Sequence, residues 1–389
     1  MMEWNELYEA LSEKLSSEEL EDLIDRKARL DQINYHGIYD DAGFQRVSGL
    51  GKDLYLPKLN KTVDYVSLKP CETIIDVESP IAKAFYELQN TLQVLQSDKK
   101  ELQIGAISNG VHSIDLLMRY FNKEEICKIY NKEQSHKRVM IIYEAPASNL
   151  YATAAYRSRS KAKNPEEPND REPSVKDYLQ KGKFNGEILD CLTGVWWRLD
   201  SLDSDVEKAI NTNEAFSGAK KYTEFLVGFI RAFGILDLYT TNLFRYEIFK
   251  SDDEKSLGWD EVSKLTAEDG SMFEIIDIAF EKIVRKEIEA YKPNIILATS
   301  KPYNYLWYKK PENAERNKQV MPVQELKNIP IYKIPHPACQ LDKDYRECVN
   351  ICRITKVLCE ANVITSVTAS EIIKEHYLNR IPTCISTKD

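Results

Sequence analysis

The sequence contains no apolar run of the roughly 18 residues that a transmembrane helix needs. Its first residues, Met1-Met2-Glu3-Trp4, do not combine a basic segment with an apolar one, so we expect no signal peptide. We therefore expect a cytoplasmic protein with no membrane partner. The formal net charge of −9 argues against indiscriminate binding to nucleic acids, because neutralising phosphates takes clustered cations. A local basic groove remains compatible with this charge.

The eight cysteines include no Cys-x-x-Cys pair, the spacing that is typical of many zinc and redox sites. Cys348, Cys352 and Cys359 have a spacing that places them along one face of a helix. A stripe of this kind is typical of a helix packed on a core, and a metal site is the alternative. We expect reduced thiols and no bound metal.

Four short apolar runs, each followed by polar residues, dominate the second part of the chain. They are residues 139–142, 235–239, 294–298 and 331–334. Long stretches with helical periodicity lie between the second and third runs and after the fourth. Such an alternation predicts a parallel sheet covered on both faces. We therefore expect an α/β fold, a three-layer αβα sandwich around a central parallel four-stranded sheet.

The composition divides the chain into three parts. They are residues 1–130, 131–375 and 376–389. The first part has apolar residues at helical spacing over Glu6 to Leu30 and predicts a mainly helical N-terminal extension. The second holds the α/β core, where a charged, Pro-containing segment predicts an insertion at about 150–213. The third is a short tail.

Polar side chains follow three of the apolar runs, where the strands would end. Glu144, Asn242 and His336 follow the first, second and fourth run. Because open α/β sheets bind ligands outside the carboxyl ends of their strands, we expect these three side chains to converge on one crevice. Each also has an ordinary structural reading. Glu144 or Asn242 could cap a helix, and His336 could stabilise a turn.

These side chains offer complementary chemistry. A half-desolvated carboxylate such as Glu144 can position water or stabilise developing positive charge. The Asn242 amide offers a donor and an acceptor together, which suits the edge of a nucleobase. His336 lies between Pro335 and Pro337, which stiffen its loop. A neutral imidazole there can donate to an oxygen that gains negative charge.

A basic run follows Glu144 in this acidic chain. Its four cations are Arg157, Arg159, Lys161 and Lys163. This run is the best candidate for contact with phosphates, and a solvated charged surface is the alternative.

Five short motifs, taken together and in order, resemble those of the uracil-DNA glycosylase superfamily. The pattern is most similar to the iron–sulfur branch of bacteria and archaea. The motifs are Glu144-Ala145-Pro146, Phe216-Ser217-Gly218-Ala219, Tyr239-Thr240-Thr241-Asn242, Pro293-Asn294-Ile295-Ile296 and His336-Pro337-Ala338. Each is weak alone, and their common order makes the resemblance fairly specific.

The resemblance implies a monofunctional DNA glycosylase, which flips a nucleotide out of the duplex and hydrolyses its N-glycosidic bond. Glu144 would act on water or on the sugar cation, and His336 would donate to the departing base. Phe216 would stack on the base, and Asn242 would read its edge. The resemblance also implies that Tyr143 and Ala145 lie beside the base. Ser300, Gln340 and the basic run would contact the DNA.

Departures from the pattern change the expected cofactor and substrate. Tyr246 and Phe280 stand where two cluster cysteines are expected, so we expect no iron–sulfur cluster and no cofactor. Tyr143 and Ala147 replace glycines, and an insertion at about 150–213 follows. These changes predict a bulkier modified pyrimidine, such as glucosylated hydroxymethylcytosine of phage DNA, in anti-phage defence. Uracil excision in base excision repair and an inactive module that binds a modified base are the alternatives.

Overall fold

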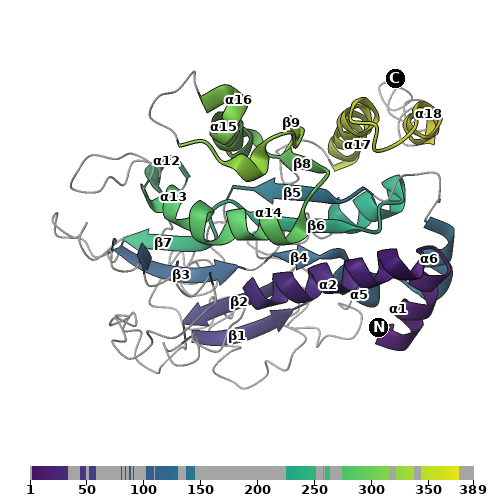
Figure 1. Ribbon diagram of the computed structural model, residues 1–389, viewed down its shortest axis with the longest axis horizontal. Coiled ribbons are helices and arrows are strands. Elements are labelled where there is room, and N and C mark those ends of the chain that lie inside the picture. The colour runs from purple at the N-terminus through teal and green to yellow at the C-terminus, as the bar shows by residue number, and fades with distance from the viewer. Residues whose placement is uncertain are drawn as a thin grey trace, which may run out of the picture.

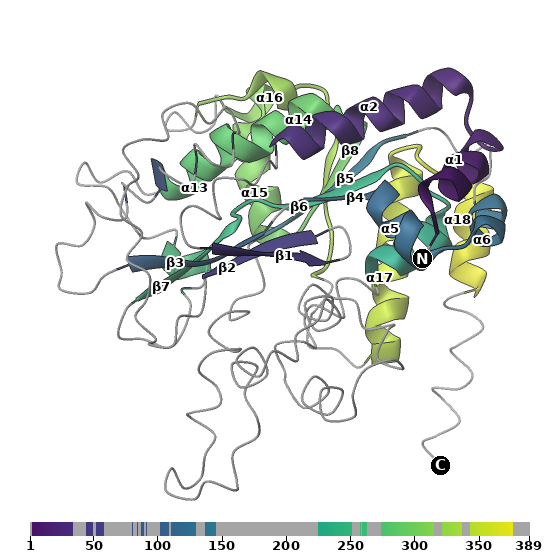
Figure 2. The same ribbon diagram turned by 90° about the horizontal axis from the view of Figure 1, so that it is seen from below.

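A computed structural model gives the arrangement of the chain (Figures 1 and 2). The residues that it describes are 2–33, 44–49, 52–57, 80, 84, 87–88, 91, 102–108, 110–129, 137–144, 225–250, 257, 259–262, 274–314, 321–336 and 343–375. Among the helices in these ranges, none is long and apolar enough to cross a membrane.

A mixed five-stranded sheet lies at the centre of the molecule, with strand order β4-β6-β5-β8-β9 (Figure 1). Its strands are β4 (Val111–His112), β5 (Val139–Tyr143), β6 (Leu238–Asn242), β8 (Ile295–Ala298) and β9 (Ile331–Lys333). The last four are the predicted strands, and neighbours among them pair in parallel. The short β4 adds an antiparallel edge beside β6. The fold is therefore α/β, as expected. The prediction of a wholly parallel, four-stranded sheet is wrong, because the sheet has a fifth, antiparallel strand.

Both faces of the central sheet carry apolar side chains, and helices cover both. Met140 and Ile142 of β5 belong to one core cluster, whereas Val139 and Ile141 belong to another, as the alternation of side chains along a strand requires. The first cluster includes residues of α13 (Glu274–Ala279), the π-helical segment η3 (Phe280–Val284), α14 (Arg285–Tyr291) and α15 (Ser300–Lys309). The second includes residues of α5 (Ser113–Tyr120), the helical segment 225–233, α17 (Lys343–Glu360) and α18 (Ser366–Ile373).

A second, antiparallel sheet joins the N-terminal region to the strand that follows β6. Its order is β1-β2-β3-β7. The strands are β1 (Phe44–Gly49), β2 (Lys52–Pro57), β3 (Leu102–Ser108) and β7 (Tyr246–Lys250). Residues 1–130 thus contain strands that the helical periodicity did not predict, and two of them, β3 and β4, pair with strands of the core.

The stretch from Glu6 to Leu30, which was expected to be helical, is covered by two helices. They are α1 (Trp4–Ser12) and α2 (Ser17–Ile33). The break occurs at Ser16, whose amide donates to the Glu19 carboxylate at 2.8 Å, while the Glu19 amide donates to Ser16 Oγ at 3.4 Å. This reciprocal capping starts a new helix. α2 then lies beside α14, as both views show (Figures 1 and 2). The remaining short elements are α6 (Lys123–Ile129), α12 (Trp259–Val262), α16 (Pro311–Ala314) and η4 (Gln324–Leu326).

Candidate functional site

The parallel strands of the central sheet end at one common edge. Tyr143 and Asn242, the last residues of β5 and β6, are direct partners. Ala298 and Lys333, the last residues of β8 and β9, are likewise partners. The register therefore aligns the four carboxyl ends, which is the edge where open α/β sheets bind ligands.

Three of the predicted site residues lie at this edge. Glu144 directly follows β5, Asn242 ends β6, and His336 comes shortly after β9. Asn242 is buried, whereas Glu144 and His336 are half-buried. The structure thus brings together the strand ends that carry a carboxylate, an amide and an imidazole.

Backbone hydrogen bonds hold the junction between β5 and β6 beyond the end of the strands. The Leu243 amide donates to the Tyr143 carbonyl at 2.7 Å, and the Phe244 amide donates to the Glu144 carbonyl at 3.0 Å. These two bonds continue the strand pairing past Asn242. The backbone of Glu144 is consequently fixed beside the bend that follows Asn242.

The loop that carries His336 is attached in the same way. The Ile334 amide donates to the Ala298 carbonyl at 2.8 Å, which extends the pairing of β9 with β8 toward His336. Burial lowers the pKa of His336 below its usual range, because desolvation disfavours the imidazolium form. The imidazole is therefore neutral at pH 7 and has one N–H to donate.

The other predicted site residues differ in where they lie. Ser300 is exposed and opens α15 at the same edge of the sheet. Tyr143 is only 4% exposed, and its side chain belongs to the core cluster of Val139 and Ile141. Outside the described residues lie Phe216, Ala145, Gln340, the basic run of Arg157, Arg159, Lys161 and Lys163, the insertion at about 150–213 and the tail 376–389.

Two aromatic residues were expected to stand in place of cluster cysteines, namely Tyr246 and Phe280. Both are fully buried in the core cluster that contains Met140 and Ile142. Cys352 and Cys359, members of the predicted cysteine stripe, lie half-buried on α17. Within the part of the chain that the structure describes, no group of His, Cys, Asp or Glu side chains could hold a metal ion.

A buried ion pair beside Asn242 was not predicted from the sequence. Arg245 and Glu287 are both fully buried, and Arg245 Nη2 contacts Glu287 Oε1. The same nitrogen donates to Thr241 Oγ1 at 2.7 Å, and the Tyr239 hydroxyl donates to Glu287. Four polar side chains thus contact one another on the face of β6 that α14 covers.

The sequence does contain a signal for one member of this cluster. Glu287 follows Ile283 and Val284 at helical spacing and directly precedes Ile288, so it stands on the apolar stripe of its helix. A carboxylate at such a position requires a buried partner. The identity of that partner, Arg245, is set by tertiary structure and has no local signature.

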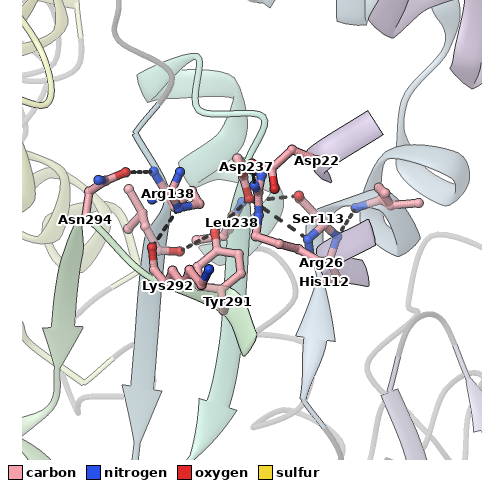
Figure 3. A network of polar contacts seen from close by, with 12 residues as sticks. Asp22, Arg26, His112, Ser113, Arg138, Asp237, Leu238, Tyr291, Lys292 and Asn294 are labelled. Atoms are coloured by element: carbon pink, nitrogen blue, oxygen red, sulfur yellow. Dashed lines mark hydrogen bonds and ion pairs between the residues drawn. The ribbon is translucent and has the colours of Figure 1, made fainter. Parts of the chain in front are cut away.

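A second polar cluster lies at the opposite, amino-terminal edge of the central sheet (Figure 3). Asp237, which precedes β6, forms an ion pair with Arg26 of α2 and accepts a hydrogen bond from the Tyr291 hydroxyl at 2.9 Å. Arg26 also pairs with Asp22. His112 Nε2 lies 4.0 Å from Asp237 Oδ1. The cluster therefore connects α2, α14 and two strands of the sheet.

The electrostatics of this second cluster favour a structural role. Burial raises the pKa of Asp237, although the nearby Arg26 opposes the shift. Burial also lowers the pKa of His112 well below its usual range, with Lys27 and Arg26 adding to the effect. The neutral His112 accepts from the Ile114 amide through Nδ1 at 3.2 Å and caps α5. Because these contacts join elements inside the protein, we place the candidate site at the carboxyl edge.

The candidate site therefore consists of Glu144, Asn242 and His336 at the ends of three parallel strands, with Ser300 nearby. Together they offer a carboxylate, an amide and a neutral imidazole at one edge of the sheet. No protein-family model, curated protein or solved structure matches the chain, so its function is inferred from these residues.

Proposed function

We propose that this protein is a monofunctional DNA glycosylase, which hydrolyses the N-glycosidic bond of a pyrimidine and leaves an abasic site. The observation that supports the proposal is the alignment of Glu144, Asn242 and His336 at one edge of the sheet. In this proposal the four parallel strands and the helices on both faces serve as the αβα core of the enzyme.

Breaking an N-glycosidic bond creates two charges, and the site has a group for each. The sugar becomes oxocarbenium-like, and Glu144 would stabilise it or orient the attacking water. The base leaves with negative charge, and the neutral His336 would donate to its oxygen. Asn242 would bind the edge of the base through its amide. No metal or redox group takes part in these steps.

The strand order is compatible with the separation that the proposal requires between Glu144 and His336. β8 lies between β5 and β9, so their ends are two strand spacings apart. At about 4.8 Å per spacing, this amounts to roughly 10 Å between backbones. Side chains from both ends, Glu144 and His336, would therefore reach opposite ends of one flipped nucleoside.

We further propose that the base is a modified pyrimidine, such as glucosylated hydroxymethylcytosine of phage DNA. Support comes from the sequence alone, where Tyr143 and Ala147 replace glycines of the similar family and an insertion follows. Removal of uracil in repair would use the same three residues. The substrate assay below separates these two activities, and also separates both from a module that binds a modified base without cleaving it.

The test is strand cleavage by alkali after incubation with matched duplexes that contain uracil, hydroxymethylcytosine or glucosylated hydroxymethylcytosine. Glu144→Gln and His336→Asn keep the approximate shape of each side chain and should each abolish cleavage. Glu360→Gln on α17, where the Glu360 side chain is 54% exposed, is the matched control and should cleave like the wild type. Binding without an abasic product on any duplex would refute the catalytic proposal.

A further inference from the structure

We propose that Arg245 and Glu287 are positioning residues, which hold the end of β6 and thereby set Asn242 against Glu144. This inference rests on the proposed function. Neither side chain is exposed, so neither touches a substrate, and both act through the backbone that they fix.

Arg245 closes the bend that follows Asn242. Its Nη2 donates to Thr241 Oγ1 at 2.7 Å and to the Tyr239 hydroxyl at 3.4 Å. The Arg245 side chain thus contacts β6, the strand that precedes it in the chain. Asn242 lies inside the segment closed by this contact, between Thr241 and Arg245.

Glu287 ties that bend to a helix. Its Oε1 contacts Arg245 Nη2 and accepts a hydrogen bond from the Tyr239 hydroxyl. Tyr239 and Thr241 are two residues apart on β6, so both side chains point to the face that α14 covers. One carboxylate therefore holds the strand and the bend together.

The cluster is also connected to Glu144. The Phe244 amide, next to Arg245, donates to the Glu144 carbonyl at 3.0 Å. Because Arg245 directly follows Phe244, we expect a displacement of Arg245 to move this amide and the backbone of Glu144 with it. The ion pair therefore fixes the position of the proposed catalytic carboxylate relative to the proposed base-binding amide.

The energetics indicate that the pair contributes geometry rather than stability. Taking a guanidinium and a carboxylate out of water is unfavourable, and apolar side chains of similar volume are often as stable in their place. Gly110 brings the backbone against the cluster, since a Cβ there would lie 1.9 Å from the Tyr239 oxygen. A buried, directional ion pair in such a closed space has few alternative arrangements, which is what a site in need of fixed geometry requires.

The test uses the double variant Arg245→Met/Glu287→Leu, which removes both charges and keeps apolar volume. Its first readout is hydrogen exchange at the amides of Leu243 and Phe244, which should become faster than in the wild type, whereas exchange at Leu297 of β8 should not change. Its second readout is kcat and KM on the duplex that the wild type cleaves. A displacement of about 1 Å should lower kcat about 100-fold and leave KM little changed.

An exposed ion pair provides the control. Arg231 Nη2 lies 3.1 Å from Glu125 Oε1, and the two side chains are 48% and 37% exposed. The double variant Arg231→Gln/Glu125→Gln should match the wild type in both readouts. Tyr239→Phe, which removes a single hydroxyl of the cluster, repeats the test if the first double variant does not fold.

If hydrogen exchange at the amides of Leu243 and Phe244 is unchanged in the double variant Arg245→Met/Glu287→Leu, the positioning role is overturned, whatever the kcat of that variant. Faster exchange with unchanged kcat would overturn its link to catalysis. If the wild type cleaves no duplex, the proposed function fails, and the exchange measurement still decides whether the pair holds the junction.

Discussion

Replacing Glu287 by Gln should destabilise the protein more than replacing Arg245 and Glu287 together by apolar residues. Glu287→Gln leaves the guanidinium of Arg245 in place at 0% exposure, and an arginine does not lose its charge in proteins. A buried charge that loses its partner destabilises a protein by about 3–5 kcal/mol. This is a large part of the roughly 5–15 kcal/mol by which a typical domain is stable.

In contrast, the double variant Arg245→Met/Glu287→Leu contains no unpaired charge. Its free energy of unfolding should lie within about 1 kcal/mol of the wild type or above it. Urea unfolding followed by the fluorescence of the five tryptophans measures both differences. The control is Glu125→Gln, whose partner Arg231 is 48% exposed, and which should lower stability by about 1 kcal/mol at most. A Glu287→Gln loss as small as that of Glu125→Gln would refute the reasoning, because it would mean that water reaches the buried pair.

Three further results are expected. Burial raises the pKa of Asp115 from 3.8 to about 6, so its contribution to stability is present below pH 3.8 and is lost as pH rises through about 6. Asp115→Asn should therefore stabilise the protein at pH 8 by up to about 3 kcal/mol and have little effect at pH 4, which urea unfolding at both pH values would reveal. Gly110→Ala should lower the stability of the protein by about 1–3 kcal/mol, because the added Cβ would meet the Tyr239 hydroxyl. Gly228→Ala should raise it by about 0.5–1 kcal/mol, because nothing lies within 4 Å of its Cβ. Calorimetry would show the Tm values of the two variants moving in opposite directions. Because burial lowers the pKa of His336, the kcat of the proposed glycosylase should not fall between pH 8 and the ordinary histidine pKa of 6.5, and an earlier fall would contradict a neutral donor.

The central strands could be predicted from the sequence because their apolar runs are continuous. Strands buried on both faces have no polar residue to interrupt the signal, as in β5 and β8, where every residue is buried. β4 escaped prediction because two residues, Val111 and His112, are too few to show any period. Its place at the edge of the sheet depends on pairing with β6, a contact between distant parts of the chain.

The sequence predicted those residues of the candidate site that lie at the end of a strand or shortly after it. Glu144, Asn242 and His336 lie at one edge because parallel strands run in the same direction. The alternation of apolar runs with helical stretches had predicted parallel strands. Side-chain partners are different, since Arg245 and Glu287 come from separate elements and only the packing of α14 on β6 joins them. Asp237 gave a partial signal, as an acid within an apolar run, but its partner Arg26 lies far away on α2.

The pairing of β4 with β6 and of β3 with β7 has a consequence for fragments of this protein. A polypeptide started at residue 131 would contain every strand that carries the proposed catalytic residues, yet β6 and β7 would each lose a neighbour. Open strand edges of this kind pair with other chains, so the fragment should aggregate. In the 389-residue chain the same pairings link distant segments, and such topologies fold slowly. β3 and β4 therefore cover the edges of β7 and β6, and we expect that expression of residues 131–389 as a well-behaved protein requires them.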